Sequence, residues 1–184
     1  MGIRLSQIVL IAWFSLGIQV CLFGQDTLYG FYTVYDDSFR EWVVPFEEIG
    51  EGEIRMKWPL KDDWTHWEIN IGDYYGNVKR RWSSTPGQWE AKIDGALIDI
   101  KTIYPRDFRS WRLKMDGITL DLKMVYSNSA ELWTLENKRA YMDIFTATEG
   151  DPRDWLVDDQ LADIPIQMKL AAMVICIYHS CPKI

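Results

Sequence analysis

The chain has 184 residues, of which 48% are hydrophobic and 14% aromatic, and its formal net charge is −7. A chain of this length is long enough for one domain with a substantial apolar core. The acidic balance argues against nucleic acid as a partner, because phosphates would be repelled over most of the surface.

Residues 1–24 have the layout of a secretory signal peptide. Arg4 precedes a long apolar run, and the small residue Gly24 stands directly before Gln25. We predict cleavage between Gly24 and Gln25 and a secreted or periplasmic protein. The alternative is an uncleaved anchor, because the apolar run is long enough to span a bilayer. Residues 25–184 then form the single domain, with 19 basic and 27 acidic residues.

Six tryptophans recur at a nearly constant spacing, with successive gaps of 25, 22, 22, 22 and 22 residues: Trp42, Trp67, Trp89, Trp111, Trp133 and Trp155. Other positions keep the same register, and aromatic residues stand seven positions before four of these tryptophans: Tyr35, Trp82, Tyr104 and Tyr126. Self-similarity at a fixed period is typical of a fold built from one repeated supersecondary unit.

Each repeat has the pattern of a β-hairpin. In the stretch WEAKIDGALIDIKTIY, residues 89–104, apolar and polar side chains alternate on both sides of Asp94-Gly95. Alternation is typical of a half-buried strand, and Asp-Gly suits a two-residue hairpin turn. Asp116-Gly117 repeats this turn at the same offset. We expect a longer turn over residues 72–76, GDYYG, and a turn without glycine at residues 137–139, NKR.

The repeats give about twelve antiparallel strands: a leading strand over 28–35, five hairpins, and a last strand from Trp155. Such a set forms either a closed barrel or two packed sheets. Residues 165–181 decide between them, because this segment is apolar on all sides and so predicts a buried helix. A twelve-stranded barrel has a lumen too wide for strand side chains alone to fill. We therefore predict an all-β barrel around a hydrophobic C-terminal helix.

A barrel of twelve strands around a hydrophobic C-terminal helix resembles the tubby-like barrel of tubby C-terminal domains, LURP-one-related proteins and phospholipid scramblases. The resemblance covers nearly all of residues 25–184 and rests on the strand count and the closing helix. It implies binding or handling of phosphoinositides or other membrane lipids. No family motif is present to transfer lipid-binding residues to this chain.

Basic side chains form one candidate site. Lys79, Lys101 and Lys123 stand at equivalent positions of three repeats, so the barrel would stack them in a column, with Arg80 and Arg81 at its edge. This column would suit an anionic headgroup. The alternative is ion pairing across the strands with acids two positions earlier, namely Asp99, Asp121 and Asp143.

Acidic residues before the repeats form a second candidate site, which includes Asp36, Asp37, Asp62, Asp63, Asp107 and Asp154. They would bind calcium, or act as acid and base, only where they converge; otherwise they bond nearby backbone amides. Trp58, Trp64 and Trp82 lie outside the repeat column and offer an aromatic platform for sugars or acyl chains. Phe39 and Phe108 share the position of Trp64 and favour packing for it instead.

The remaining chemically active residues favour structural roles. His179 is expected to interact with carbonyls at the helix end, Lys169 to extend outward from the helix start, and His66 to be exposed. Cys176 and Cys181 are placed poorly for a disulfide. We predict no metal, cofactor or catalytic residue, and the sequence leaves the oligomeric state open.

These observations predict a non-catalytic binding or structural module of the cell envelope, for a lipid or another amphipathic ligand. The alternative is a hydrolase of envelope glycans or lipids with carboxylates clustered at one barrel end, of which Asp62, Asp63 and Asp107 are the candidates.

Overall fold

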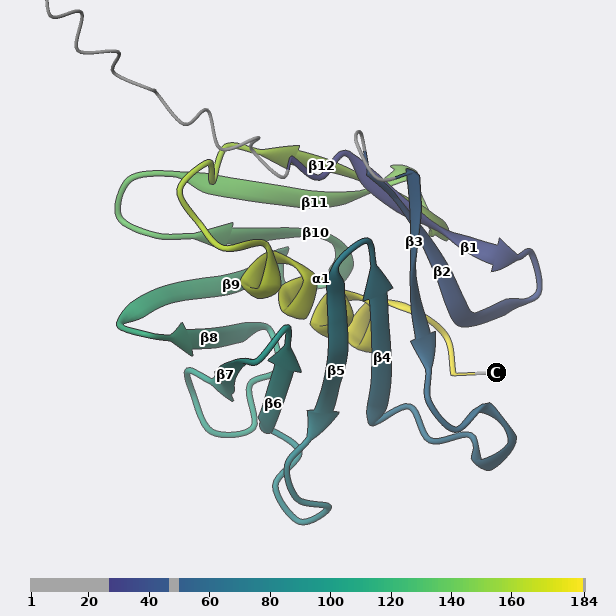
Figure 1. The fold of residues 1–184 in the computed structure, drawn as a ribbon, viewed down its shortest axis with the longest axis horizontal. Helices are drawn as coiled ribbons and strands as arrows, with labels where there is room; N and C mark the ends of the chain where they lie inside the picture. The colour runs from purple at the N-terminus through teal and green to yellow at the C-terminus, as the bar shows by residue number, and fades with distance from the viewer. Residues whose placement is uncertain (1–26, 47–49, 184) are drawn as a thin grey trace, which may run out of the picture.

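The computed structural model describes residues 27–46 and 50–183, which form a closed antiparallel barrel with one α-helix (Figure 1). The predicted signal peptide and residues 47–49 of the first hairpin turn lie outside the described residues. The strands are β1 (Gly30–Tyr35), β2 (Ser38–Phe46), β3 (Gly50–Met56), β4 (His66–Ile71), β5 (Tyr74–Arg80), β6 (Gln88–Ile93), β7 (Ala96–Thr102), β8 (Ser110–Met115), β9 (Ile118–Tyr126), β10 (Ser129–Glu136), β11 (Tyr141–Thr148) and β12 (Asp151–Asp159).

Each strand pairs with its neighbours in sequence, and β1 pairs with β12 to close the barrel. The closing seam places Phe31 opposite Trp155, with their rings stacked 5.6 Å apart. Along β4, Trp67, Ile69 and Ile71 are fully buried, while the residues between them are less buried. The alternation in the sequence therefore places apolar side chains in the lumen, as predicted.

Helix α1 (Ile166–Ser180) lies inside the ring of strands (Figure 1). Every residue from Met168 to Ile177 is at most 3% exposed, so no face of this segment meets water. The predicted helix at 165–181 and its place in the lumen are confirmed. Among the described helices, none is both long and apolar enough to cross a bilayer.

Lys169 does not extend outward, so that prediction was wrong. Its ammonium lies 2.7 Å from a carboxylate oxygen of Asp159, and the two side chains are 3% and 2% exposed. Asp159 ends β12 on the inward face and also accepts the backbone amides of Leu28 and Leu161. The pair therefore joins the first turn of α1 to the barrel wall.

The hairpin turns follow the predicted chemistry with one correction. Asp94 and Gly95 have φ of 47° and 77°, the left-handed pair that a type I′ hairpin needs. The turn within GDYYG is shorter than expected, because β5 already begins at Tyr74 and leaves two residues outside the ladder. In the turn without glycine, the Asn137 side chain accepts the amides of Arg139 and Ala140.

Candidate functional site

The six repeated tryptophans gather at one end of the barrel. Each lies on an even-numbered strand, and even-numbered strands all begin at the same end, which we call the tryptophan end. Every indole Nε1 donates to the backbone carbonyl three residues earlier, over 2.7–3.0 Å. All six indole side chains are fully buried. The repeat therefore fixes the chain path of each connection at this end.

The C-terminal turn of α1 packs against this tryptophan ring. Tyr178 meets Trp89 edge to face at 4.7 Å. The Ser180 hydroxyl donates to the carbonyl of Ala130 and accepts a hydrogen bond from the indole of Trp133. The helix is therefore held by hydrogen bonds at one end and by the Lys169–Asp159 pair at the other.

His179 is enclosed by aromatic rings, with Trp111 at 5.2 Å, Phe108 at 5.7 Å and Trp133 at 6.2 Å. Burial lowers the pKa of His179 from 6.5 to about 3, and the charge of Lys183 acts in the same direction. Its Nε2 is buried without a hydrogen-bond partner in the described chain. The prediction that His179 interacts with the carbonyls at the helix end is therefore wrong. The ammonium of Lys183 donates a hydrogen bond to the carbonyl of Tyr178 instead.

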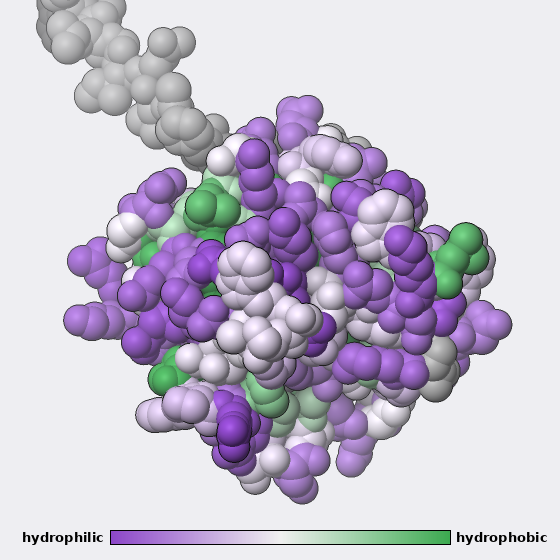
Figure 2. All heavy atoms as spheres, turned by 90° about the horizontal axis from the view of Figure 1, so that it is seen from below, coloured by the Kyte–Doolittle hydropathy of each residue, from purple (hydrophilic) through white to green (hydrophobic). Residues whose placement is uncertain are grey.

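Exposed aromatic side chains surround this end of the barrel. Six connections lead into even-numbered strands, and five of them either contain an exposed aromatic residue or directly follow one. These aromatic residues are 44–63% exposed: Tyr35, Trp58, Trp82, Tyr104 and Tyr126. We call these five residues the aromatic crown. Leu60, next to Trp58, is fully exposed. In Figure 2, pale residues gather near the centre of a mostly hydrophilic face that also carries some hydrophobic residues, drawn green. This face lies on the side toward which the β3–β4 and β5–β6 connections project in Figure 1.

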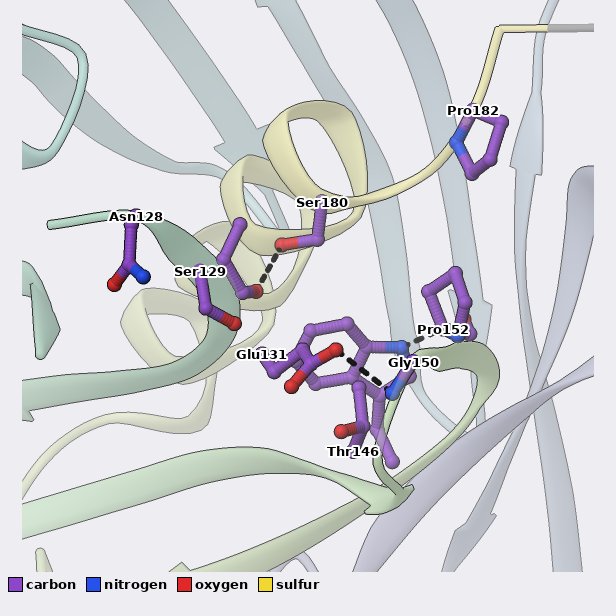
Figure 3. Close-up of a pocket in the computed structure, with 10 residues that line it drawn as sticks. Asn128, Ser129, Glu131, Thr146, Gly150, Pro152, Ser180 and Pro182 are labelled. Atoms are coloured by element: carbon purple, nitrogen blue, oxygen red, sulfur yellow. Dashed lines mark hydrogen bonds between the residues drawn. The ribbon is translucent and has the colours of Figure 1, made fainter. Parts of the chain in front are cut away.

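A hollow of about 320 Å³ lies between the β9–β10 and β11–β12 connections (Figure 3). Hydrogen bonds within the protein involve its lining residues. Glu131 accepts the amide of Gly150, and Ser180 is bonded to Ala130 at its rim. This hollow is the joint between the helix end and the barrel wall, because its hydrogen bonds hold protein to protein.

A second hollow, of about 450 Å³, separates the β5–β6 connection from the β7–β8 connection; we call it the loop pocket. Its lining includes Ser84, Thr85, Gln88, Thr102, Arg106 and Phe108, and no acidic residue. A third hollow, of about 570 Å³, lies at the opposite end beside the chain that leads into α1. Of the three, the loop pocket is the one whose two bounding connections both contain a crown residue, Trp82 and Tyr104.

The predicted basic column exists on the outer wall, and each of its lysines is ion-paired. Lys79 lies 3.2 Å from Glu90, Lys101 lies 2.7 Å from Asp99, and Lys123 pairs with Glu136. Lys79 and Lys123 pair across strands, but with Glu90 and Glu136 instead of the predicted acids, and Lys101 pairs with Asp99 within β7. Asp121 pairs with Arg112, and Asp143 accepts the hydroxyl of Thr134. The column presents little net positive charge, because each lysine stands beside an acid.

The two arginines at the edge of the column lie in different surroundings. Arg81 pairs with Glu90 at 3.2 Å and with Asp99 at 3.1 Å. Arg80 stands opposite Trp89 in the ladder, on the inward face at the end of β5, and is partly buried. The structure therefore does not bring Arg80 into the same row as the three lysines.

Trp64 is 5% exposed and packs edge to face on Trp67 at 5.9 Å. Its indole donates to Asp62, and Asp62 also pairs with Arg40 at 3.0 Å. Asp63 accepts both the hydroxyl and the amide of Thr65. Burial acts to raise the pKa of Asp63, but these hydrogen bonds outweigh it and lower the pKa below 3.8. These three residues organise the β3–β4 connection.

Asp107 lies in the β7–β8 connection, apart from Asp62 and Asp63. Hydrogen bonds from the side chain and amide of Arg109, with the guanidinium 2.9 Å away, lower the pKa of Asp107. The described residues contain no group of three or more His, Cys, Asp and Glu placed to hold a metal ion. His66 is half-buried instead of exposed, and burial lowers its pKa. Cys176 and Cys181 are both buried and free.

Sequence reasoning identified the aromatic column seven residues before the tryptophans, but not its exposure as a ring. It also passed over Arg106, which has φ of 64°. The Pro-Arg order at 105–106 was the available signal, because proline favours the second position of a turn whose third position takes positive φ.

The fold and this end define a class of protein: a closed, twelve-stranded antiparallel barrel around its own C-terminal helix, with an exposed aromatic crown at the tryptophan end. No protein-family model, no curated protein and no solved structure matches the chain.

Proposed function

We propose that the protein is a non-catalytic binding module of the cell envelope that contacts an amphipathic ligand through the aromatic crown. The observation that carries this proposal is the recurrence of an exposed aromatic residue at five of the six connections of one barrel end. Tyrosine and tryptophan combine an apolar ring with a polar group, so they favour surfaces that are apolar on one side and wet on the other.

The rest of the barrel supports a site on its outside. Helix α1 occupies the lumen, and every residue from Met168 to Ile177 is at most 3% exposed, so the lumen is packed around the helix. The outer wall is covered by ion pairs such as Arg112–Asp121 and Lys79–Glu90, which suit contact with water. The tryptophan end is where exposed aromatic groups and loops of varied sequence come together.

Two features of the sequence support the proposed location and the proposed ligand class. Export by the segment at 1–24 would place the module outside the cytoplasm. The barrel also resembles the tubby-like barrel, whose members bind or handle membrane lipids, and this resemblance supports an amphipathic ligand. The hydrolase alternative needs free carboxylates at a defined separation. Asp62 and Asp107 are instead engaged by Arg40 and Arg109, which argues against this alternative.

The test is a binding screen of the purified protein against phosphatidylglycerol vesicles, phosphatidylcholine vesicles and an array of envelope glycans. We expect binding to at least one ligand class. The crown variant W82A/Y104A/Y126A should weaken that binding at least tenfold while it melts at the wild-type temperature, because the three side chains are more than half exposed.

The matched control is Y75A/L97A/Y141A, which removes three exposed apolar side chains on the outer wall near the other end. It should bind as the wild type does. Binding to no ligand in the screen would refute the proposal. Equal weakening in both triple variants would mean that the crown is not the contact surface.

A further inference from the structure

The loop pocket lies between two connections that the repeat makes equivalent. Trp82 and Tyr104 each begin a tight turn, in which the amides of Thr85 and Asp107 reach back to the carbonyls of Trp82 and Tyr104. The β5–β6 connection is joined to the end of β7 by a hydrogen bond from the amide of Thr102 to the carbonyl of Gly87. The pocket floor is thus part of the barrel, and its sides are two ordered turns.

Arg106 occupies the third position of its turn in the left-handed region, with φ of 64°. The other non-glycine residues with positive φ in the described chain are all aspartates, which tolerate this region better than arginine. Glycine would be the unstrained choice at this position. Local strain that the sequence retains is often found where a side chain has a binding role.

The guanidinium of Arg106 is exposed and has no hydrogen bond or ion pair with the described chain. Its neighbours differ: Arg109 is paired with Asp107, and Lys101 is paired with Asp99. The two connections, residues 81–87 and 103–109, contain three arginines and one aspartate on a chain that is acidic as a whole. Arg81 and Arg109 are paired with acids, so the pocket lining offers one positive charge, that of Arg106, without an acidic partner among the described residues.

Hydroxyl and amide groups supply the rest of the lining, from Ser84, Thr85, Gln88 and Thr102. The hydroxyl oxygen of Thr85 is buried and has no hydrogen-bond partner in the described chain. A buried hydroxyl without a protein partner is destabilising, so a ligand that bonds it would remove this cost. These groups donate and accept hydrogen bonds alike, as a polyhydroxylated ligand requires.

Trp82 and Tyr104 stand in the two connections that form the sides of the pocket, next to its lining residues in the sequence. Both are 63% exposed. Trp82 starts the turn that ends at Thr85, and Tyr104 stands between Ile103 and Pro105, which both line the pocket. Sugar rings have apolar faces and polar edges, and this combination of aromatic rings with hydroxyl and amide groups matches them.

We propose that the loop pocket binds an acidic saccharide, a sugar chain that carries carboxylates, with Arg106 on one carboxylate. A guanidinium pairs with a carboxylate through two parallel hydrogen bonds. One unpaired arginine matches the single charge of a uronic acid better than the multiple charge of a phosphate group. Thr85 and Gln88 bind ring hydroxyls, and Trp82 and Tyr104 cover the sugar faces. The inference rests on the proposed function, since it names the ligand class of the same barrel end.

The experiment is isothermal titration of the purified protein with a tetramer of galacturonic acid and with the same tetramer reduced to its neutral alcohol form. We expect the acidic tetramer to bind at least tenfold more tightly than the reduced one. Raised salt should remove much of that difference, because the charged contact is exposed.

Two variants separate binding from folding. Arg106→Gly relieves the left-handed strain, so it should melt at or above the wild-type temperature while its affinity for the acidic tetramer falls about tenfold or more. Thr85→Val removes a hydroxyl that bonds nothing in the protein and should weaken binding without loss of stability. The controls are Arg109→Gly, which removes an arginine that Asp107 engages, and Leu97→Ala on the outer wall near the opposite end.

Each outcome decides the inference. Full affinity in Arg106→Gly, or equal affinity for the two tetramers, overturns the saccharide site. If vesicles bind and that binding needs Trp82 and Tyr104 but not Arg106 or Thr85, the crown acts on lipid and the pocket inference fails alone. If neither tetramer nor any vesicle or glycan binds, the proposed function fails with it.

Discussion

Replacing Lys169 with methionine should destabilise the barrel more than any surface substitution. Methionine keeps the length of the side chain but leaves the Asp159 carboxylate buried without its cation. Charges 2.7 Å apart attract by about 6 kcal/mol at an effective dielectric constant of about 20, and the cost of burying both offsets most of this. Removal of one partner leaves that cost in place, so we expect a loss of about 3–5 kcal/mol.

The assay is urea unfolding followed by tryptophan fluorescence, which reports on the tightly packed tryptophan ring. The midpoint should fall while the slope stays constant, because the surface exposed on unfolding is unchanged. The double variant K169M/D159N should recover part of the loss, since asparagine still accepts the amide of Leu161 and carries no charge. A loss below about 1 kcal/mol in K169M would place the pair in the range of surface ion pairs and refute the reasoning.

Three further outcomes follow from the tryptophan end. The pKa of His179 is about 3 in the folded protein and 6.5 in the unfolded chain, so its contribution to stability is complete above pH 6.5 and is lost as the pH falls toward 3. Between pH 7 and pH 4, the free energy of unfolding should fall by up to about 3 kcal/mol. The variant His179→Phe should flatten this dependence of the urea midpoint on pH. Trp111→Phe leaves the carbonyl of Phe108 without its indole donor, so the free energy of unfolding in the same assay should fall by about 1–3 kcal/mol. Trp82 is exposed, and Trp82→Phe should change the free energy of unfolding by less than about 0.5 kcal/mol. Burial raises the pKa of both Cys176 and Cys181, so a thiol reagent at about pH 8 should label neither thiol until the protein is unfolded. Prompt labelling of the native protein would contradict their buried positions.

The barrel was predictable because its repeat imposes two periods at once. Alternation fixes which face of each strand is buried, and the Trp column fixes the register between repeats. Asp94-Gly95 and Asp116-Gly117 place the turns, because few sequences adopt two successive positive φ angles. The helix followed from its lack of a polar face and from a lumen that needs filling.

Contacts between distant positions were harder to predict. Lys169 was visible as one charge in an apolar helix, but its partner was not identified. The signal was present, since Trp155, Val157 and Asp159 alternate along β12 and so place Asp159 on the inward face. The hydrogen bond from each indole to the carbonyl three residues earlier could not be predicted from the sequence either, because that bond depends on the path of the connection.

The candidate site was less accessible from the sequence than the fold. The aromatic column at Tyr35, Trp82, Tyr104 and Tyr126 was identified, but alternation does not apply in a connection, so exposure could not be assigned. The basic column was placed on the outer wall correctly, while its ion-pair partners depend on rotamers. Arg106 emerges only when its backbone conformation is known.

The seam between β1 and β12 sets the order in which this protein folds. Each hairpin joins neighbouring residues and forms within microseconds, so the wall begins to assemble locally. Its closure waits for the last strand, and the lumen remains unfilled until α1 has followed it. Barrel closure is therefore a slow step of high contact order, and the chain stays open during synthesis until nearly all of its described length has emerged. We expect a late, single cooperative transition, in which closure of the wall and burial of α1 occur together.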